Sequence, residues 1–349
     1  MTSEYKIALV GASSLLAKEL KEALTESPLA SASFLLLDEK DSHGQLDQIG
    51  DEVTVVQAID NTSFEGIDFA FFAGSEEMTQ KHWRSAVRAG AMVLDLTGAL
   101  DGEPGVLVRS PWLGDALGMP DLLTKAIVPA NSAALALALL LDRLQEVAEV
   151  KFVAATVLQP SSEFGKDALD ELHQQTVSLL SFQTMPQAMF DTQVAYNTLA
   201  SFGESATVNL ARAEARIRRH YAALAGNKLP ELRLQLLHAP VFHGHTFSIC
   251  IELDRALPLS TIEEALGGEH LDLVLEATDS PSNLAAVGQN DVLVWLKPEP
   301  PITPGSGRGS EEISRFWLWA GSDNLRLAAL NAVDCALDLR RLRPQGQVQ

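Results

Sequence analysis

The sequence predicts an α/β protein with a doubly wound, mostly parallel sheet, followed by a second domain of α+β type. Short apolar strands that lack a polar face alternate with amphipathic helices over roughly the first 130 residues, a pattern typical of a parallel sheet covered by helices on both sides. From Val150 the pattern changes to longer strands and longer helices. A chain of 349 residues is also too long for one ordinary core, so two domains are expected.

The first domain begins with an apolar run that ends in glycine, residues 5–11. In residues 15–26, Leu16, Leu20 and Leu24 recur at helical spacing between charged residues, which predicts a helix. Further strands are predicted at 33–37, 52–58, 68–72 and 92–95, with a helix at 77–88. A connection rich in proline and glycine follows over 101–120.

The second half begins with a long apolar helix, residues 133–144. Strands are predicted at 150–158, 232–239, 246–253, 271–277 and 291–297, and helices at 163–181 and 205–225. Residues 298–310 have the composition of a loop, and the final segment, 323–342, has the apolar spacing of an amphipathic helix. The sequence contains no internal repeat.

Composition narrows the classes of function. The formal net charge of −20 disfavours binding to nucleic acid or to anionic membranes. No run of eighteen uncharged apolar residues occurs, and the N-terminus does not have the pattern of a signal peptide. The two cysteines, Cys250 and Cys335, lie in apolar patterns and do not suggest disulfides. A cytoplasmic protein is therefore expected.

The turn after the first strand partly matches the fingerprint of a Rossmann-like dinucleotide-binding domain. Gly11 provides the tight turn and Ala17 the small residue where helix packs on strand, whereas Ser14 replaces the middle glycine. An ordinary strand-to-helix turn explains the same residues. Asp38, at the end of the second strand, is a candidate to bind a ribose hydroxyl and would disfavour a 2′-phosphate, although a solvated charge at a strand end is an equal alternative.

Four later segments follow one another along the chain in a particular order. They are Pro129-Ala130-Asn131-Ser132, Gln159-Pro160-Ser161-Ser162-Glu163-Phe164-Gly165, Pro240-Val241-Phe242-His243-Gly244-His245, and Ala320-Gly321-Ser322-Asp323-Asn324-Leu325-Arg326. In this order and spacing the chain resembles the aspartate-semialdehyde dehydrogenase family, from Ile7 to about Leu339.

The resemblance implies a domain 1–132 that binds NADP or NAD and is completed by the C-terminal segment 322–349, and a substrate and dimerisation domain 133–321. It implies a homodimer that reduces an acyl phosphate through a thioester, with a small acyl or aldehyde substrate. Ser132 falls at the position of the nucleophilic cysteine, Gln159 at that of a substrate-positioning glutamine and His245 at that of the acid/base histidine. The implied cofactor contacts are Gly11, Ser13, Ser14, Leu15, Ser162, Gly165 and Asn324, and the implied substrate contacts are Asn131 and His238.

The departures from the family pattern concern the chemistry itself. Ser132 replaces a cysteine, and a hydroxyl is far less ionised than a thiol near neutral pH. His238 and Leu100 fall where the two substrate-binding arginines are expected, and neither can grip a carboxylate in a bidentate way. Glu163 and Phe164 replace the two middle residues of the family's Ser-Gly-Ala-Gly loop, and a phosphate-binding lysine expected in the helix around 205–220 has no secure counterpart.

Several residues have simpler interpretations. Ser132 can act as a helix N-cap, and Asp323 and Asn324 can cap the last helix. His238, His243 and His245 lack a carboxylate or thiol that would complete a metal site, so no metal is expected. The region around 163–181 is expected to form a dimer face, although core packing explains the same apolar periodicity.

Three hypotheses follow. The first is a catalytically impaired or inactive paralogue that still binds a dinucleotide and dimerises. The second is an active semialdehyde dehydrogenase, or an oxidoreductase for another acyl or aldehyde substrate. The third is a hydrolase that uses Ser132 as nucleophile and His245 as base.

Overall fold

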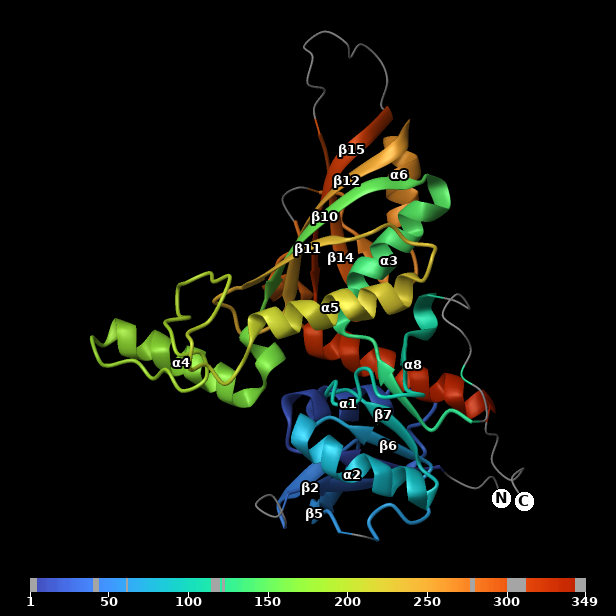
Figure 1. Ribbon diagram of the computed structural model, residues 1–349, viewed down its shortest axis with the longest axis vertical. Coiled ribbons are helices and arrows are strands. Elements are labelled where there is room, and N and C mark those ends of the chain that lie inside the picture. The colour runs from blue at the N-terminus through green and yellow to red at the C-terminus, as the bar shows by residue number, and fades with distance from the viewer. Residues whose placement is uncertain are drawn as a thin grey trace. The chain divides into compact units, whose positions relative to one another are not determined.

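The computed structural model describes residues 5–39, 44–60, 62–113, 120, 123–276, 280–299 and 312–342. The chain forms two compact units, Met1–Asn131 with Ala328–Gln349, and Ser132–Leu327. The boundary near the C-terminus falls inside helix α8 (Asn324–Leu342). In Figure 1 the chain is coloured from blue at the N-terminus to red at the C-terminus, so each element can be found by its place in the sequence.

The first unit is built on a seven-stranded sheet in which every pairing is parallel. Its order is β5 (Gln57–Ala58), β2 (Ser33–Asp38), β1 (Lys6–Val10), β6 (Phe69–Phe72), β7 (Met92–Asp95), β9 (Ala126–Pro129) and β8 (Leu107–Arg109). The order of the strands reverses next to β1, so the sheet is doubly wound, as predicted. Ligands of such sheets bind beyond the carboxyl ends of the strands, at the point where the strand order reverses.

Helices pack on both faces of this sheet because successive strand residues point to opposite sides. On one face, Ile7 and Leu9 of β1 contact the cluster that includes α1 (Leu15–Thr25) and the C-terminal part of α8. On the other, Ala8 and Val10 join Trp83 of α2 (Glu76–Ala89). The prediction of a parallel sheet covered on both sides is confirmed.

The strand predicted at 52–58 is wrong as a single element. Residues Glu52–Val55 form β4, which pairs antiparallel with β3 (Leu46–Ile49) in a separate sheet of two strands, and β5 alone joins the parallel sheet. Val53 and Val55 are exposed in this hairpin, so the apolar alternation there did not mark a buried face. Strand β8 was also missed because it lies within the proline- and glycine-rich connection.

The second unit contains a mixed six-stranded sheet. Its order is β11 (Arg233–His238), β10 (Val150–Gln159), β12 (His245–Pro258), β15 (Glu312–Ser322), β14 (Val292–Pro298) and β13 (Leu271–Leu273). Helix α3 (Ser132–Val147) contacts β10 as well as α5 (Leu210–Ala225) and α6 (Leu259–Leu266). Helix α3 is almost entirely buried, which explains its nearly uninterrupted alanine and leucine sequence.

Two predictions for this unit need correction. The helix expected at 163–181 is two elements, a 3-10 helix Ser161–Phe164 and α4 (Lys166–Leu180), because Gly165 at φ 87° and ψ −171° interrupts the helix. Strand β15 was not predicted, nor were α6 and α7 (Asn283–Ala286). Residues 300–310 of the expected loop and residue 277 of an expected strand lie outside the described residues.

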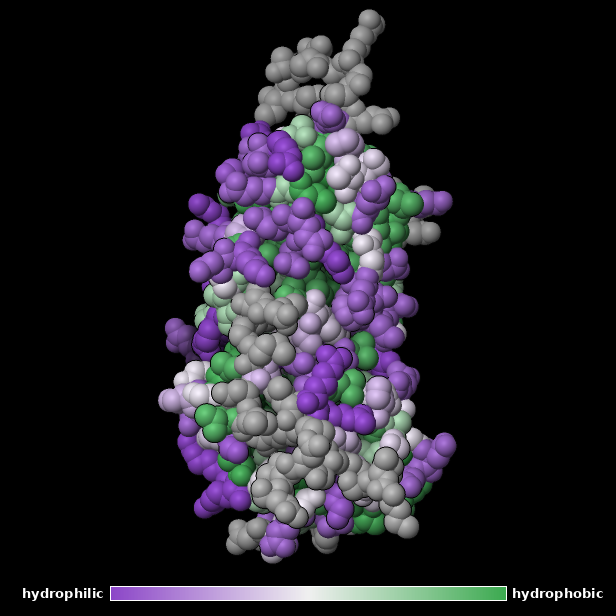
Figure 2. Space-filling model, turned by 90° about the vertical axis from the view of Figure 1, so that its right-hand side faces the viewer, coloured by the Kyte–Doolittle hydropathy of each residue, from purple (hydrophilic) through white to green (hydrophobic). Residues whose placement is uncertain are grey.

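Hydrophilic residues cover most of the coloured surface on the face shown in Figure 2, as expected for a chain with a net charge of −20. Within the described part of the chain, no helix combines the length and the apolar character needed to cross a membrane.

Candidate functional site

Four polar residues line up at one edge of the second unit's sheet. Gln159 ends β10 and pairs with His238 at the end of β11, while His245 begins β12 and pairs with Ser322 at the end of β15. Strands β10 and β12 are neighbours, with Leu158 opposite Thr246. The sheet therefore brings together the three residues Gln159, His238 and His245 that the sequence selected, and adds Ser322, which it did not.

These four side chains are buried, each at most 1% exposed. Gln159 Nε2, His238 Nδ1, both ring nitrogens of His245 and Ser322 Oγ have no hydrogen-bond partner among the described residues. An unpaired buried polar group costs free energy, and native proteins pair nearly all of them with protein, water or ligand. The polar atoms of this row are therefore available to hydrogen-bond water or a ligand.

The segment after β10 carries a second set of site residues. The Ser162 hydroxyl donates to Asn324 Oδ1 at 3.1 Å, and the backbone N–H of Gly244 donates to the same oxygen at 3.1 Å. Asn324 Nδ2 in turn donates to Glu163 Oε2 at 3.0 Å. The chain segments around 162, 244 and 324, which are far apart in sequence, are thus joined through one amide side chain.

Asp323 rather than Asn324 caps α8. Its carboxylate accepts hydrogen bonds from the backbone N–H groups of Leu325 and Arg326, both at 3.0 Å, as an N-cap residue does. Asn324 is the first helical residue, and its side chain is committed to the Ser162–Glu163 segment. The capping interpretation therefore holds for Asp323 and not for Asn324.

His238 lies within a cluster of aromatic rings. Its ring centroid is 5.1 Å from that of Phe190, 5.3 Å from Phe202 and 6.3 Å from Phe164. Ser161 Oγ lies 3.5 Å from His238 Nε2. Burial lowers the pKa of His238 to about 4, so the imidazole is neutral at pH 7. A neutral ring inside an aromatic cluster does not provide the positive charge that a substrate carboxylate needs.

His245 is also buried, and burial lowers its pKa, with the carboxylates of Glu163 and Asp323 acting in the opposite direction. Its Nε2 lies 3.9 Å from Glu163 Oε2, too far for a hydrogen bond. A neutral imidazole can accept a proton, so a role as general base remains open to it.

Ser132 is the first residue of α3 and is 2% exposed. Both ring nitrogens of His245 lack a hydrogen-bond partner among the described residues, so Ser132 is not hydrogen-bonded to this histidine. The serine–histidine pair that the sequence left open is therefore not formed in the structure. Asn131 precedes it and belongs to the other unit.

In the first unit, the turn between β1 and α1 requires glycine at its first position. Gly11 has φ +83°, and a Cβ there would lie 2.2 Å from the Cα of Gly74, on the loop after β6. Ser14, at the place of the middle glycine, is the N-cap of α1 and accepts from the backbone N–H of Ala17 at 3.0 Å. Its hydroxyl donates to the carbonyl of Ala73 at 2.7 Å, so it fixes the same two loops.

Asp38 takes part in this turn. Its Oδ2 accepts hydrogen bonds from the Ser13 hydroxyl at 2.6 Å and from the Ser13 backbone N–H at 2.9 Å. Asp38 is 5% exposed, which rules out the solvated strand-end charge that the sequence allowed.

The turn retains groups that suit a dinucleotide. The backbone N–H groups of Leu15 and Leu16 lie in the first turn of α1, where N–H groups have no partner within the helix. Free N–H groups at a helix N-terminus bind phosphate, and Gly11 keeps the turn close to the neighbouring loop. The residues thus fit a pyrophosphate, although the N–H of Ser13 is already bound to Asp38.

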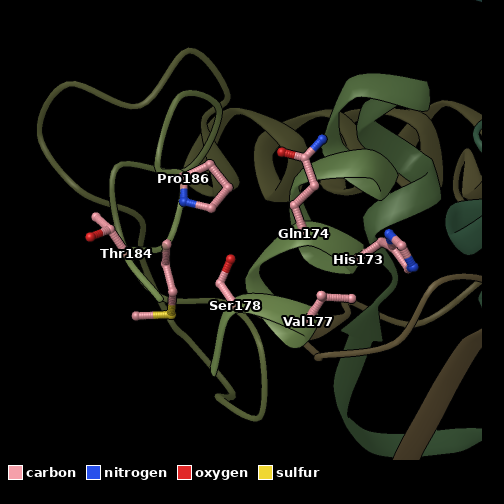
Figure 3. A pocket seen from close by; sticks show the side chains of 7 residues that line it. His173, Gln174, Val177, Ser178, Thr184 and Pro186 are labelled. Carbon is pink, nitrogen blue, oxygen red and sulfur yellow. The ribbon is translucent and has the colours of Figure 1, made fainter. Parts of the chain in front are cut away.

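A pocket of about 510 Å³ lies elsewhere in the second unit. It is lined by His173, Gln174, Val177 and Ser178 of α4 and by Thr184, Met185 and Pro186 of the following segment (Figure 3). It contains none of the predicted site residues. Among the described residues, no group of three or more histidine, cysteine, aspartate or glutamate side chains is arranged to hold a metal ion.

Comparison with known proteins agrees with this geometry. Residues 6–130 match the semialdehyde dehydrogenase NAD-binding domain, and residues 141–298 match the semialdehyde dehydrogenase dimerisation domain. The first unit, with its doubly wound sheet and dinucleotide-type turn, corresponds to the NAD-binding domain of the semialdehyde dehydrogenases. The second unit, with its mixed sheet, corresponds to their dimerisation domain. The chain belongs to the aspartate-semialdehyde dehydrogenase family.

Among its relatives is a protein named USG-1 protein homolog from Azotobacter vinelandii, 30% identical over 344 residues, which cover 96% of this chain and 98% of the relative. An aspartate-semialdehyde dehydrogenase from Rickettsia bellii is 27% identical over 353 residues, covering 97% and 98%. The solved structure of a probable aspartate-semialdehyde dehydrogenase from Pseudomonas aeruginosa has a TM-score of 0.82 at 26% identity and covers 98% of this chain and 99% of its own.

Sequence reasoning missed three parts of the site. Glu163 was noted only as a departure from the family loop, Ser322 was not singled out, and the aromatic residues Phe190 and Phe202 around His238 gave no signal. The two phenylalanines lie in a segment without regular structure, whose position next to β11 follows from tertiary packing alone.

Proposed function

We propose that this chain is a dimeric member of the semialdehyde dehydrogenase family that binds a dinucleotide but has lost the thioester chemistry of the family reaction. The observation that carries the proposal is the buried Ser132 at the start of α3, which makes no hydrogen bond to a ring nitrogen of His245. An alkoxide forms only with an adjacent base, whereas a cysteine at a helix N-terminus is readily ionised.

The substrate side supports the same conclusion. His238 takes the place of an arginine and is neutral at pH 7 because burial lowers its pKa to about 4. Phe164, Phe190 and Phe202 surround it. A guanidinium binds a carboxylate through two parallel hydrogen bonds, and a neutral imidazole among aromatic rings offers neither the charge nor the geometry.

Dinucleotide binding is supported by the turn at Gly11 and by the N–H groups at the start of α1. A bound dinucleotide would supply a hydride donor or acceptor. Asp38, held beside Ser13, places a negative charge where a 2′-phosphate would be repelled, so NAD is the favoured form. Ser162, Gly165 and Asn324 are the cofactor contacts of the second unit that the family resemblance implies.

The test is to titrate the purified chain with NADH, following energy transfer from tryptophan to the bound nicotinamide, and to assay phosphate-dependent oxidation of aspartate semialdehyde. We expect binding without turnover. A Ser132→Cys variant should also be inactive, because the nucleophile is only one of the lost parts. Turnover by the natural chain would overturn the proposal, and loss of that turnover in a Ser132→Ala variant would identify a serine-dependent enzyme.

A second candidate is an oxidoreductase that acts on a free carbonyl without a covalent intermediate. It is favoured by the unpartnered row formed by Gln159, His245 and Ser322, which can hydrogen-bond a carbonyl or hydroxyl group. Cofactor-dependent turnover of a neutral aldehyde or alcohol that survives Ser132→Ala and is lost in His245→Ala would establish this candidate instead. The hydrolase hypothesis has no geometric support, because neither ring nitrogen of His245 has a hydrogen-bond partner among the described residues.

A further inference from the structure

A long irregular segment, residues 181–209, joins α4 to α5 and lies beside α4 in Figure 1. The structure describes every residue of this segment, and apart from an isolated β-bridge at Leu199 it contains neither helix nor strand. Connections of this length inside a compact domain are uncommon and often serve as lids or binding loops. The segment is nevertheless packed. It shares a buried apolar cluster with α4, formed by Ala168, Leu172, Phe190, Val194 and Ala195.

Gln175 of α4 holds this segment by its backbone. The side chain is fully buried, and its Oε1 accepts hydrogen bonds from the N–H groups of Val194 at 2.8 Å and Ala195 at 3.2 Å. Its Nε2 donates to the carbonyl oxygens of Pro186 at 2.8 Å and Thr192 at 2.9 Å. One amide side chain thus pairs four backbone groups of a segment that has no regular structure in which to pair them.

Glu171, one helical turn earlier, adds two further hydrogen bonds. Its carboxylate is buried and accepts from the backbone N–H groups of Met189 at 2.6 Å and Phe190 at 3.3 Å. Residues four positions apart lie on the same face of a helix. Glu171 and Gln175 therefore form one continuous attachment of residues 186–195 to α4.

The backbone of the attached segment is strained. Phe182, Asp191 and Tyr196 have φ of 55°, 49° and 58°, and His270 is the one other non-glycine residue with positive φ among the described residues. The left-handed conformation costs free energy for a residue with a side chain, and it persists only where the surroundings hold it. The hydrogen bonds of Glu171 and Gln175 provide this restraint around Asp191 and Tyr196.

The segment covers His238 at the end of β11. The ring centroids of Phe190 and Phe202 lie 5.1 Å and 5.3 Å from that of His238. Leu199 exchanges two backbone hydrogen bonds with the same residue, at 2.8 Å and 3.0 Å. His238 is 0% exposed as a result.

We propose that residues 181–209 are a lid, which Glu171 and Gln175 hold closed over His238. Release of the lid from α4 opens this end of the buried polar row to solvent and to small molecules. The strain stored in the segment favours release, and the six hydrogen bonds to the two side chains oppose it. The lid does not depend on dinucleotide binding and is tested separately from it.

The experiment labels the full-length chain with diethyl pyrocarbonate, a small reagent that modifies accessible imidazole nitrogens, and follows each histidine by mass spectrometry of peptides. Gln175→Leu removes four of the hydrogen bonds and keeps a side chain of similar size in the buried position. Gln174→Leu makes the same change at the neighbouring exposed position of α4. We expect labelling of His238 to be at least tenfold faster in Gln175→Leu and to stay within twofold in Gln174→Leu. His220, which is 0% exposed in α5, should stay protected in all three proteins.

Two results would contradict the lid. If Gln175→Leu has the circular dichroism spectrum of the natural chain and His238 is still protected, Gln175 does not hold the segment closed. If His238 and His220 are accelerated equally, the whole unit has loosened and the segment does not open on its own. If Gln175→Leu does not fold, hydrogen–deuterium exchange of the natural chain decides. The amides of residues 189, 190, 194 and 195 should then exchange at one common rate, at least tenfold faster than those of β10, and equal protection would overturn the proposal.

Discussion

The Ser13 hydroxyl donates a 2.6 Å hydrogen bond to the carboxylate of Asp38, which ties the turn after β1 to the end of β2. The same carboxylate oxygen accepts from the Ser13 backbone N–H at 2.9 Å. Asp38 thereby shapes the turn and places a fixed negative charge beside it. The structural role of this residue and its proposed selection between NAD and NADP have the same origin.

The first prediction concerns the choice between NAD and NADP. Asp38→Asn removes the charge but keeps an acceptor for Ser13, so the turn should persist while repulsion of a 2′-phosphate disappears. We expect the affinity for NADP⁺ relative to NAD⁺ to rise about tenfold, the size of a single charge interaction near a protein surface. Calorimetric titration measures both constants. Asp51→Asn, at an exposed position, should leave the ratio unchanged, and an equal change in both variants would contradict a specific role for Asp38.

The second prediction concerns the close approach of Gly11 to Gly74. Gly11→Ala forces a side chain into a left-handed conformation and 2.2 Å from the Gly74 Cα, so both backbone strain and a clash oppose it. We expect the free energy of unfolding to fall by about 3 kcal/mol or more, and dinucleotide binding to be lost.

Gly105→Ala is the matched control for this variant. Gly105 has a similar φ of +80°, but a Cβ there meets nothing within 4 Å. It should cost only the strain of the left-handed conformation, about 1 to 2 kcal/mol. Urea denaturation compares the two variants, and equal losses would show that the approach to Gly74 imposes no additional constraint.

The third prediction concerns the pH dependence of stability through His238. The pKa in the folded protein is about 4, below the ordinary value of 6.5, so the unfolded state binds the proton more readily. The contribution of the neutral His238 to the free energy of unfolding is fully present above pH 6.5 and is lost as the pH falls towards 4. Between pH 7 and pH 4.5 the loss should be about 2 kcal/mol.

His238→Phe tests this prediction, because a phenylalanine suits the aromatic cluster and does not titrate. The difference in unfolding free energy between pH 7 and pH 4.5 should shrink by about 2 kcal/mol in this variant. It should not vanish, since burial also lowers the pKa of His245. His173→Gln, at an exposed site on α4, should leave the difference unchanged. An undiminished pH dependence in His238→Phe would show that His238 is not the group responsible.

The parallel sheet of the first unit could be predicted because its strands are buried on both faces and end at glycine or aspartate, as β1 and β2 do. The row at the edge of the second sheet could be predicted only through family resemblance, since Gln159, His238 and His245 are separated by up to 86 positions. Local patterns carry no information about such pairing. Strand β15 was missed for a different reason: Trp317 and Trp319 lie between buried residues, so its alternation is apolar on both faces.

The break before α4 was missed because the sequence 163–181 has helical periodicity throughout. The backbone at Gly165 lies outside the helical region, and glycine permits this where another residue would be strained. The break positions Glu163 and Phe164 separately, one towards Asn324 and the other among the rings around His238. Periodicity describes which residues can share a face, but the φ and ψ of one glycine decide whether the face continues.

The last prediction concerns the surface through which two copies associate. Phe316 and Leu318 of β15 are each 1% exposed, whereas Trp317 between them is 41% exposed and therefore points to the opposite face of the sheet. On that face Trp317 pairs with Cys250 on one side and Lys297 on the other, and Trp295 pairs with Trp319. A sheet face bearing several tryptophans suits a protein interface, where tryptophan commonly dominates the binding energy.

Trp317→Glu should therefore convert the dimer into monomer at micromolar concentration, a weakening of at least about a hundredfold, because it places a charge in an apolar contact. Light scattering coupled to gel filtration measures the mass, and circular dichroism verifies folding. Phe182→Glu, at a side chain that is 98% exposed just after α4, serves as the competing variant. If Phe182→Glu dissociates the dimer and Trp317→Glu does not, the region around 163–181 is the dimer face and the sheet is not. If both variants remain dimeric, neither surface holds the two copies together.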